Sequence, residues 1–92
     1  MHNIQTSDHH FYIGQPDAPQ AWIDFTLSDQ VLTLVHTEVT SVLQGQGVAG
    51  QLVAFAVNYA REHQYKVVPV CEYAAGQFAK KAEYRDVLLN PK

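Results

Sequence analysis

Alternating apolar and polar positions predict an antiparallel hairpin in the first third of the chain. In Ala21–Leu27 every second residue is apolar, which is the pattern of a strand with one buried face. The residues expected on that face are Ala21, Ile23, Phe25 and Leu27. A polar turn at 28–30 leads into Val31–Val35, which is apolar on both faces, as is typical of a central strand. The two stretches should pair with each other, and Phe11–Ile13 forms the firm part of a weaker strand before them.

A long, largely apolar helix is predicted over Val48–Glu62. When successive residues are placed 100° apart, Gln51, Asn58 and Glu62 fall in one narrow polar stripe. The rest of the surface is almost entirely apolar, so the helix must be covered over most of its circumference. We therefore expect it to pack on the sheet, with its aromatic residues in the core.

The residues after this helix predict a parallel neighbour for the central strand. Lys66–Val70 is a short apolar strand, and strand, helix and strand together make a right-handed crossover. Pro69 has no N–H to donate, so the hydrogen-bond ladder should break or end near it. Glu72–Lys81 is predicted as a short helix and Tyr84–Leu89 as a last turn.

The predicted architecture is a mixed α/β fold, in which antiparallel strands are followed by a βαβ unit, in one domain of 92 residues. Six Lys plus Arg and a formal charge of -3 give no electrostatic footprint for nucleic acid. No apolar run approaches the ~20 residues of a membrane span. The start of the chain has no signal-peptide pattern, and its one cysteine cannot form an internal disulfide. We expect a cytoplasmic protein, monomeric or weakly dimeric, with no nucleic-acid or membrane partner.

A glycine-rich segment, Gln44–Gly50, joins the central strand to the long helix. Glycine permits positive φ and close approach of a ligand, and the unpaired N–H groups of a helix start form an anion site suited to phosphate. Gly45, Gly47 and Gly50 match G-x-G-x-x-G, but the chain is too short for a dinucleotide-binding domain and the preceding strand is not its first. A Walker A loop would need Gly-Lys-Ser/Thr, which does not occur.

A third pattern fits better, because Gln44-x-x-Gly47-x-Ala49 resembles the Q/R-x-x-G-x-G/A pyrophosphate loop of the GNAT superfamily, the acetyl-CoA-dependent N-acetyltransferases. Its neighbours follow in the same order: His36-Thr37-Glu38-Val39 before the loop, then Pro69-Val70-Cys71, then Glu83-Tyr84. The whole set resembles the small YjdJ-type branch of these proteins. The resemblance implies a GNAT-like fold, in which the two parallel strands splay apart near Pro69 and admit the pantetheine arm of acetyl-CoA.

The resemblance also implies that acetyl-CoA or CoA is bound at the glycine-rich segment, as a co-substrate. The residues expected to form this site are Val39, Gln44, Gly45, Gln46, Gly47, Val48, Ala49 and Gly50. No metal is expected: His9 and His10 are neighbours in a predicted strand, so they point to opposite faces and cannot chelate one ion together.

The general acid usual in the family is missing from this chain. GNAT enzymes commonly carry A-x-x-x-Tyr-x-x-x-Gly-Phe after the second strand, and the match beginning at Ala75 puts Ala79 in the place of the tyrosine. Tyr73 and Tyr84 are nearby substitutes, although packing explains each equally well.

Cys71 is the alternative reactive group, since it ends the second parallel strand just before a predicted helix. A helix start lowers the pKa of a thiol, although Glu72 beside it acts in the opposite direction. Such a thiol could accept the acetyl group and pass it on through a covalent intermediate. The competing interpretation is an inert, buried cysteine.

His36 and Glu38 share one face at the carboxyl end of the central strand, where ligands gather in α/β sheets. Either could act as general base for an incoming amine, or the pair could simply mark a strand end that meets solvent.

Three functions remain open on the sequence. The first is a small acetyltransferase with an unknown amine or protein acceptor, the second is a non-catalytic acyl-CoA-binding module or sensor, and the third is an interaction domain whose glycine loop is structural. The apolar helix behind Gln44, Gly47 and Ala49 argues against the third. The chain lacks the leading helices and extra strands from which larger relatives build an amine groove, so acyl-CoA binding is better supported than any particular transfer.

Overall fold

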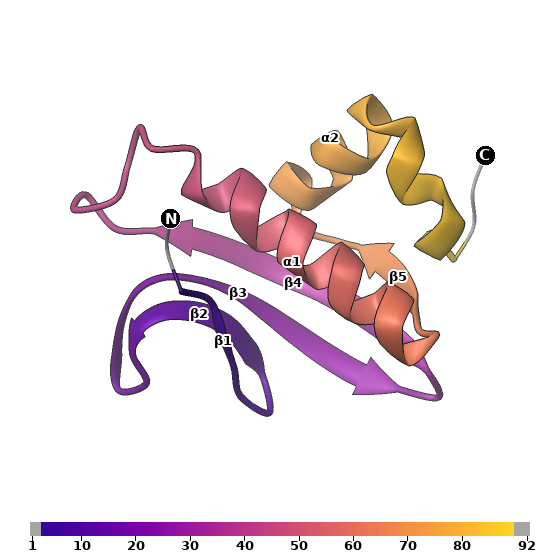
Figure 1. Cartoon of the computed structure of the whole chain (residues 1–92), viewed down its shortest axis with the longest axis horizontal. Coiled ribbons are helices and arrows are strands. Elements are labelled where there is room, and N and C mark those ends of the chain that lie inside the picture. The colour runs from indigo at the N-terminus through magenta and orange to yellow at the C-terminus, as the bar shows by residue number, and fades with distance from the viewer. Residues whose placement is uncertain (1–2, 90–92) are drawn as a thin grey trace.

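The computed structural model describes residues 3–89 and contains one five-stranded mixed sheet with helices packed on it (Figure 1). The elements in chain order are β1 (Gln5–Thr6), β2 (His10–Gln15), β3 (Ala18–Ser28), β4 (Val31–Val39), α1 (Val48–His63), β5 (Lys66–Pro69), α2 (Glu72–Lys80) and the 3-10 helix η1 (Ala82–Val87). The strands lie side by side in the order of the chain, antiparallel from β1 to β4 and parallel between β4 and β5. The predicted mixed α/β architecture is therefore confirmed, with element ends shifted by a few residues.

A β-bulge interrupts the hairpin of β3 and β4 at Val35. Asp24 lies opposite His36 and Phe25 lies opposite Leu34, so Val35 has no partner across the strand. An extra residue of this kind changes which face the following side chains occupy. Val35 is 44% exposed, although the apolar run predicted a residue covered within a central strand.

The parallel pairing of β4 with β5 is short and ends at Pro69. Four residue pairs join the two strands, the last being Leu34 with Pro69, whereas β4 continues to Val39. Beyond this point the N–H groups of Val70 and Cys71 both donate to the carbonyl oxygen of Leu34, at 3.0 and 2.9 Å. The strands then separate, as expected from the missing donor of Pro69.

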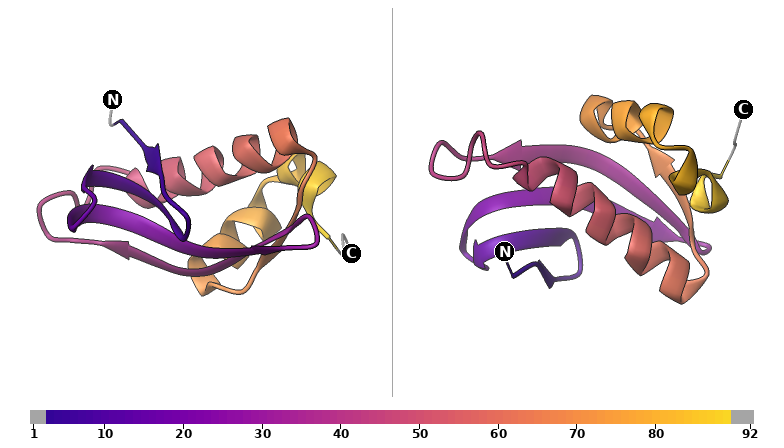
Figure 2. Two further views of the ribbon diagram at one scale, coloured as in Figure 1. Left: turned by 90° about the horizontal axis from the view of Figure 1, so that it is seen from below. Right: turned by 45° about the horizontal axis from the view of Figure 1, so that its top comes forward.

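Helix α1 lies across one face of the sheet and supplies the largest part of the helical contribution to the core (Figure 2). Its buried residues are Val48, Leu52, Val53, Ala56, Val57 and Ala60. They pack on strand side chains that include Phe11, Ile23 and Leu34. Leu27 was predicted to share this buried face, but it is 43% exposed because it sits at the end of β3, beside the turn at Asp29 and Gln30.

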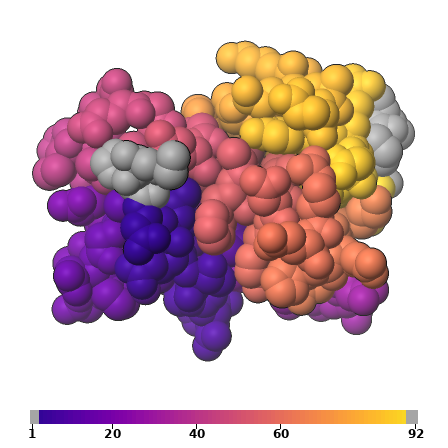
Figure 3. Space-filling view, in the orientation of Figure 1, coloured from indigo at the N-terminus to yellow at the C-terminus, as the bar shows by residue number. Residues whose placement is uncertain are grey.

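The C-terminal segment is tied to the far end of α1. The Arg61 guanidinium makes two hydrogen bonds to the Asp86 carboxylate, at 2.8 and 2.7 Å, and a third to the Glu83 carbonyl oxygen. Val67 bridges Leu88 in parallel, which returns the chain to the edge of β5. In the space-filling view this segment, in yellow, lies directly against α1 (Figure 3). Among residues 3–89 no helix is long and apolar enough to cross a bilayer.

The packing of α1 predicts that Leu52→Ala lowers the free energy of unfolding by about 2–5 kcal/mol, because this side chain is fully buried between helix and sheet. Gln51→Ala is the matched control, since Gln51 is the exposed neighbour in the same turn and should change stability by no more than about 0.5 kcal/mol. Urea titration followed by circular dichroism measures both. Equal destabilisation by the two variants would contradict this assignment of the core.

Candidate functional site

The glycine-rich segment forms a loop that projects beyond the end of the sheet and leads into α1 (Figure 1). Gly45 and Gly47 have φ values of 81° and 71°, in the left-handed region that favours glycine. A Cβ atom at either position would meet no atom within 4 Å. Backbone conformation, not lack of space, therefore explains glycine at these two positions.

Hydrogen bonds at the end of β4 hold the base of this loop. The Gln44 side chain donates to the Val39 carbonyl oxygen at 3.1 Å. Thr40 donates twice to the Gln20 carbonyl oxygen, from its backbone N–H and from its hydroxyl. Leu43 anchors the loop in the core at 6% exposure. The structure therefore uses the Gln44 side chain to shape the loop.

The start of α1 has no side-chain cap. Gly47 is the N-cap residue, and the first turn contains no acidic residue. Residues 1–60 contain neither lysine nor arginine. An anion at this helix start would thus be held by backbone N–H groups and the helix dipole, without a competing carboxylate in the turn.

Gly50 serves a different purpose from the two loop glycines. The Tyr73 hydroxyl oxygen lies only 3.3 Å from the position that a Cβ of Gly50 would take. The first turn of α2 therefore packs closely over the first turn of α1. Tyr73 keeps 40% of its surface exposed and stands at the junction of the two helix starts.

Cys71 lies where β4 and β5 separate. Its sulfur is 3.2 Å from the hydroxyl oxygen of Thr37, a β4 residue beyond the last strand pair. Thr37 is opposite the fully buried Ile23, so both point to the face that α1 covers. The structure thus brings the predicted thiol to the helix-covered face of the gap between the strands.

The environment of Cys71 lowers the pKa of its thiol below the ordinary value. Burial acts in the opposite direction and raises the pKa, but the hydrogen bond with Thr37 outweighs it together with the backbone N–H groups of Ala74, Tyr73 and Thr37. Cys71 occupies the N-cap position of α2, although its side chain makes no regular capping hydrogen bond. A lowered pKa and partial exposure are the two conditions that favour reaction of a thiol.

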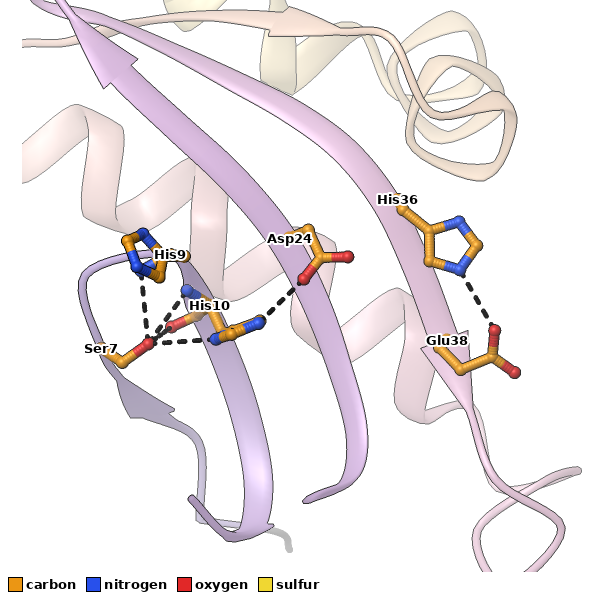
Figure 4. Close-up of polar contacts among 6 residues, drawn as sticks. All are labelled: Ser7, His9, His10, Asp24, His36 and Glu38. Atoms are coloured by element: carbon orange, nitrogen blue, oxygen red, sulfur yellow. Dashed lines mark hydrogen bonds and ion pairs between the residues drawn. The ribbon is translucent and has the colours of Figure 1, made fainter. Parts of the chain in front are cut away.

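His36 and Glu38 lie on the opposite face of β4 from Cys71. His36 is across from Asp24 and Glu38 is across from Trp22, on the face turned away from α1. The His36 Nε2 and the Glu38 Oε1 are 3.1 Å apart, and the two side chains are 56% and 47% exposed (Figure 4). The predicted pair is therefore close together, but β4 separates it from the thiol.

A second cluster on this outer face joins Ser7, His10 and Asp24 (Figure 4). Asp24 Oδ1 is 3.0 Å from His10 Nε2, and Ser7 Oγ is 3.3 Å from His10 Nδ1. The order of contacts is that of a serine, histidine and carboxylate triad. However, the Ser7 oxygen already accepts the N–H groups of His9 and His10, so it closes the turn before β2.

Two features of this region cannot be recognised from the sequence alone. The alternation of side chains did place Thr37 on the face opposite to His36 and Glu38, but gave no reason to connect it with a residue 34 positions away. The ion pair of Asp24 with His10 depends on the register between β2 and β3, which the sequence does not reveal.

A cavity of about 230 Å³ lies at the other end of α1, lined by residues that include Arg61, Tyr65, Lys66 and Asp86. Its charged groups already bind one another, because Arg61 pairs with Asp86 and the Lys66 ammonium donates to the Asp86 carbonyl oxygen. We therefore assign this cavity to the attachment of η1 and place the candidate site at the strand gap.

Comparison with known proteins identifies the family. The family model described as GCN5-related N-acetyl-transferase matches residues 10–87. The chain is also similar to the NMR solution structure of a GCN5-like protein from Staphylococcus aureus that is provisionally assigned as an N-acetyltransferase. That match has 32% identity and a TM-score of 0.79, and covers 98% of this chain and 90% of the other.

Proposed function

The chain belongs to the GCN5-related N-acetyltransferase family, and on that premise we propose that it binds acetyl-CoA at residues 44–50 and transfers the acetyl group through Cys71 to an amine. The observation that carries the proposal is the position of the Cys71 sulfur, beside Thr37 at the point where β4 and β5 separate. The acceptor is a primary amine of a small molecule or a protein.

The uncapped start of α1 supports a role in binding the pyrophosphate of CoA. No side chain caps the start of α1, and Gly45 and Gly47 hold the preceding loop in left-handed backbone conformations. From this loop, Val39 and Thr37 lead along the helix-covered face of β4 toward Cys71. An extended pantetheine arm fits this direction, with the phosphates at one end and the thioester at the other.

The reaction proceeds in two halves. The Cys71 thiolate attacks the carbonyl carbon of the thioester, a sulfur–carbon bond forms to Cys71, and CoA leaves as a thiolate. An amine then attacks the acetylated cysteine, a nitrogen–carbon bond forms, and the Cys71 thiolate leaves. The proton released by the amine passes to a base.

Glu38 and His36 are the proposed acceptors of the amine proton. Both side chains lie on the uncovered face of β4, whereas Cys71 lies on the face covered by α1. We propose that the amine approaches the gap from the uncovered face of the sheet, where these two exposed side chains lie. Glu38, hydrogen-bonded to His36, is the proposed general base.

We expect CoA to raise the melting temperature by about 10 °C or more at a concentration 100-fold above its dissociation constant, because binding then adds about 2.7 kcal/mol. Gly47→Val should abolish the shift while the protein remains folded, since a β-branched residue is strained at φ 71°. Gly76→Ala is the control: it lies within α2 in open space and should keep the shift. If millimolar CoA changed neither the melting temperature nor the calorimetric heat, the proposed binding of acetyl-CoA would be wrong.

Acetyl-CoA should add one acetyl group to the parent protein, removable by hydroxylamine and detected by intact mass spectrometry. Cys71→Ala should acquire none, and it should keep the CoA-induced thermal shift because the loop is unchanged. Transfer to an amine by Cys71→Ala at the parent rate would exclude the thioester route. Binding by the parent without any acetylation would instead indicate a non-catalytic acyl-CoA-binding module.

Glu38→Gln should slow transfer from acetylated Cys71 to a lysine-containing peptide by about 100-fold or more, as expected for loss of a general base. Acetylation of Cys71 itself should be unchanged, because the carboxylate lies on the other face of β4. Asp24→Asn is the control. Asp24 is a carboxylate on the same outer face, and its side chain forms an ion pair with His10 and not with His36. Equal transfer by Glu38→Gln and the parent would leave Glu38 without a catalytic role.

A further inference from the structure

Thr37 is a polar side chain on an otherwise apolar face. The other β4 side chains that point toward α1 are Leu32 and Leu34 before the bulge and Val39 after it. Valine would fill the same volume as threonine here and would have no hydroxyl to satisfy. The Thr37 hydroxyl is instead bonded to the Cys71 sulfur at 3.2 Å.

The bulge at Val35 is what makes this contact possible. Without the extra residue, strict alternation after Leu34 would direct His36 and Glu38 to the helix-covered face and Thr37 to the outer face. With the extra residue, the Thr37 hydroxyl points to the helix-covered face, where Cys71 lies. Cys71 is held there by its own N–H, which donates to the Leu34 carbonyl oxygen at 2.9 Å.

We propose that Thr37 is a positioning residue for Cys71, whose hydroxyl donates a hydrogen bond to the thiolate and holds it at the gap between β4 and β5. Its catalytic use rests on the proposed function, whereas its effect on the thiol does not. A hydroxyl binds an anionic sulfur more strongly than a neutral thiol or a thioester, since charge strengthens a hydrogen bond. The contact therefore favours the state of Cys71 that attacks acetyl-CoA.

The same contact acts again when the acetyl group departs. Attack of an amine on acetylated Cys71 breaks the bond between the cysteine sulfur and the acetyl carbon and regenerates the thiolate. The Thr37 hydroxyl can then donate a hydrogen bond to this thiolate again. No oxidant or further reactant is involved: the acetyl group moves from the CoA sulfur to the cysteine sulfur to the amine nitrogen, and the amine proton goes to the base. Thr37 itself gains and loses no bond other than its hydrogen bond.

The test uses alkylation of the full-length protein by iodoacetamide across a pH series, because the chain contains one cysteine and every modification therefore reports on Cys71. Removing the donor raises the thiol pKa, so Thr37→Val should need a higher pH to react and should be alkylated about fivefold more slowly at pH 7. Thr37→Ser keeps the hydroxyl and should restore most of the parent profile.

Thr33→Val is the matched control. Thr33 lies in the same strand and is partly buried, but it faces the outer side, opposite Thr26 and Val68. Its alkylation profile should coincide with that of the parent. If Thr37→Val fails to fold, Thr37→Ala removes the same hydroxyl with a smaller side chain and carries the same expectation.

A profile of Thr37→Val that coincides with the parent would overturn the inference, whatever the protein does with acetyl-CoA. If the profile shifts but no variant is acetylated, the proposed function fails and the role of Thr37 toward the thiol stands. If the parent is acetylated, Thr37→Val should be acetylated more slowly at neutral pH with little change in the KM for acetyl-CoA. Equal acetylation rates at every pH would overturn the role of Thr37 and leave the proposed function intact.

Discussion

The parallel pairing of β4 with β5 extends over only four residue pairs, and the arrangement of the site follows from where it stops. Pro69 occupies the last pair and has no N–H with which to continue the ladder. The next two N–H groups of the chain, from Val70 and Cys71, both bind the Leu34 carbonyl oxygen. This double contact ends the strand and starts α2 beside β4, while the remaining residues of β4 run on without a parallel neighbour. A ligand can enter the sheet at the edge left open in this way without breaking the four existing pairs of β4 with β5.

β4 separates two environments that differ in chemistry. On the face covered by α1, Thr37 and Cys71 form a small polar contact among apolar side chains. On the uncovered face, Glu38 and His36 form an exposed pair, next to Asp24 on the neighbouring strand. A sheet with one solvated face is ordinary for antiparallel strands, and it needs no partner to be stable. Here the bulge at Val35 determines which of the following β4 side chains lie on which face. An extra residue in β4 thus decides that Thr37 lies with Cys71 and that His36 and Glu38 face solvent.

Most of the architecture could be predicted because it depends on local periodicity. The apolar surface of α1, the alternation in β3 and the missing donor of Pro69 each act within a few residues. The contact between Thr37 and Cys71 could not be predicted, because it depends on a bulge that the apolar run around Val35 does not reveal. Leu27 was misplaced for a similar reason, since alternation assigns a face but not whether a helix reaches far enough to cover it. Gln44 fits the family motif by sequence, yet only the structure links its side chain to Val39.

The positions of the lysines along the chain determine where the protein could acetylate itself. Residues 1–65 contain no lysine, and the first lysine of the chain is Lys66. Its ammonium group donates to the Asp86 carbonyl oxygen, on the segment attached to the far end of α1. Strands β1 to β4 and the loop before α1 therefore contain no lysine, and the one lysine of β5 lies at the end of that strand away from the gap. An acetyl group carried by Cys71, as proposed, would find no lysine on β1 to β4, so lysines of these strands would not compete with an amine supplied from outside.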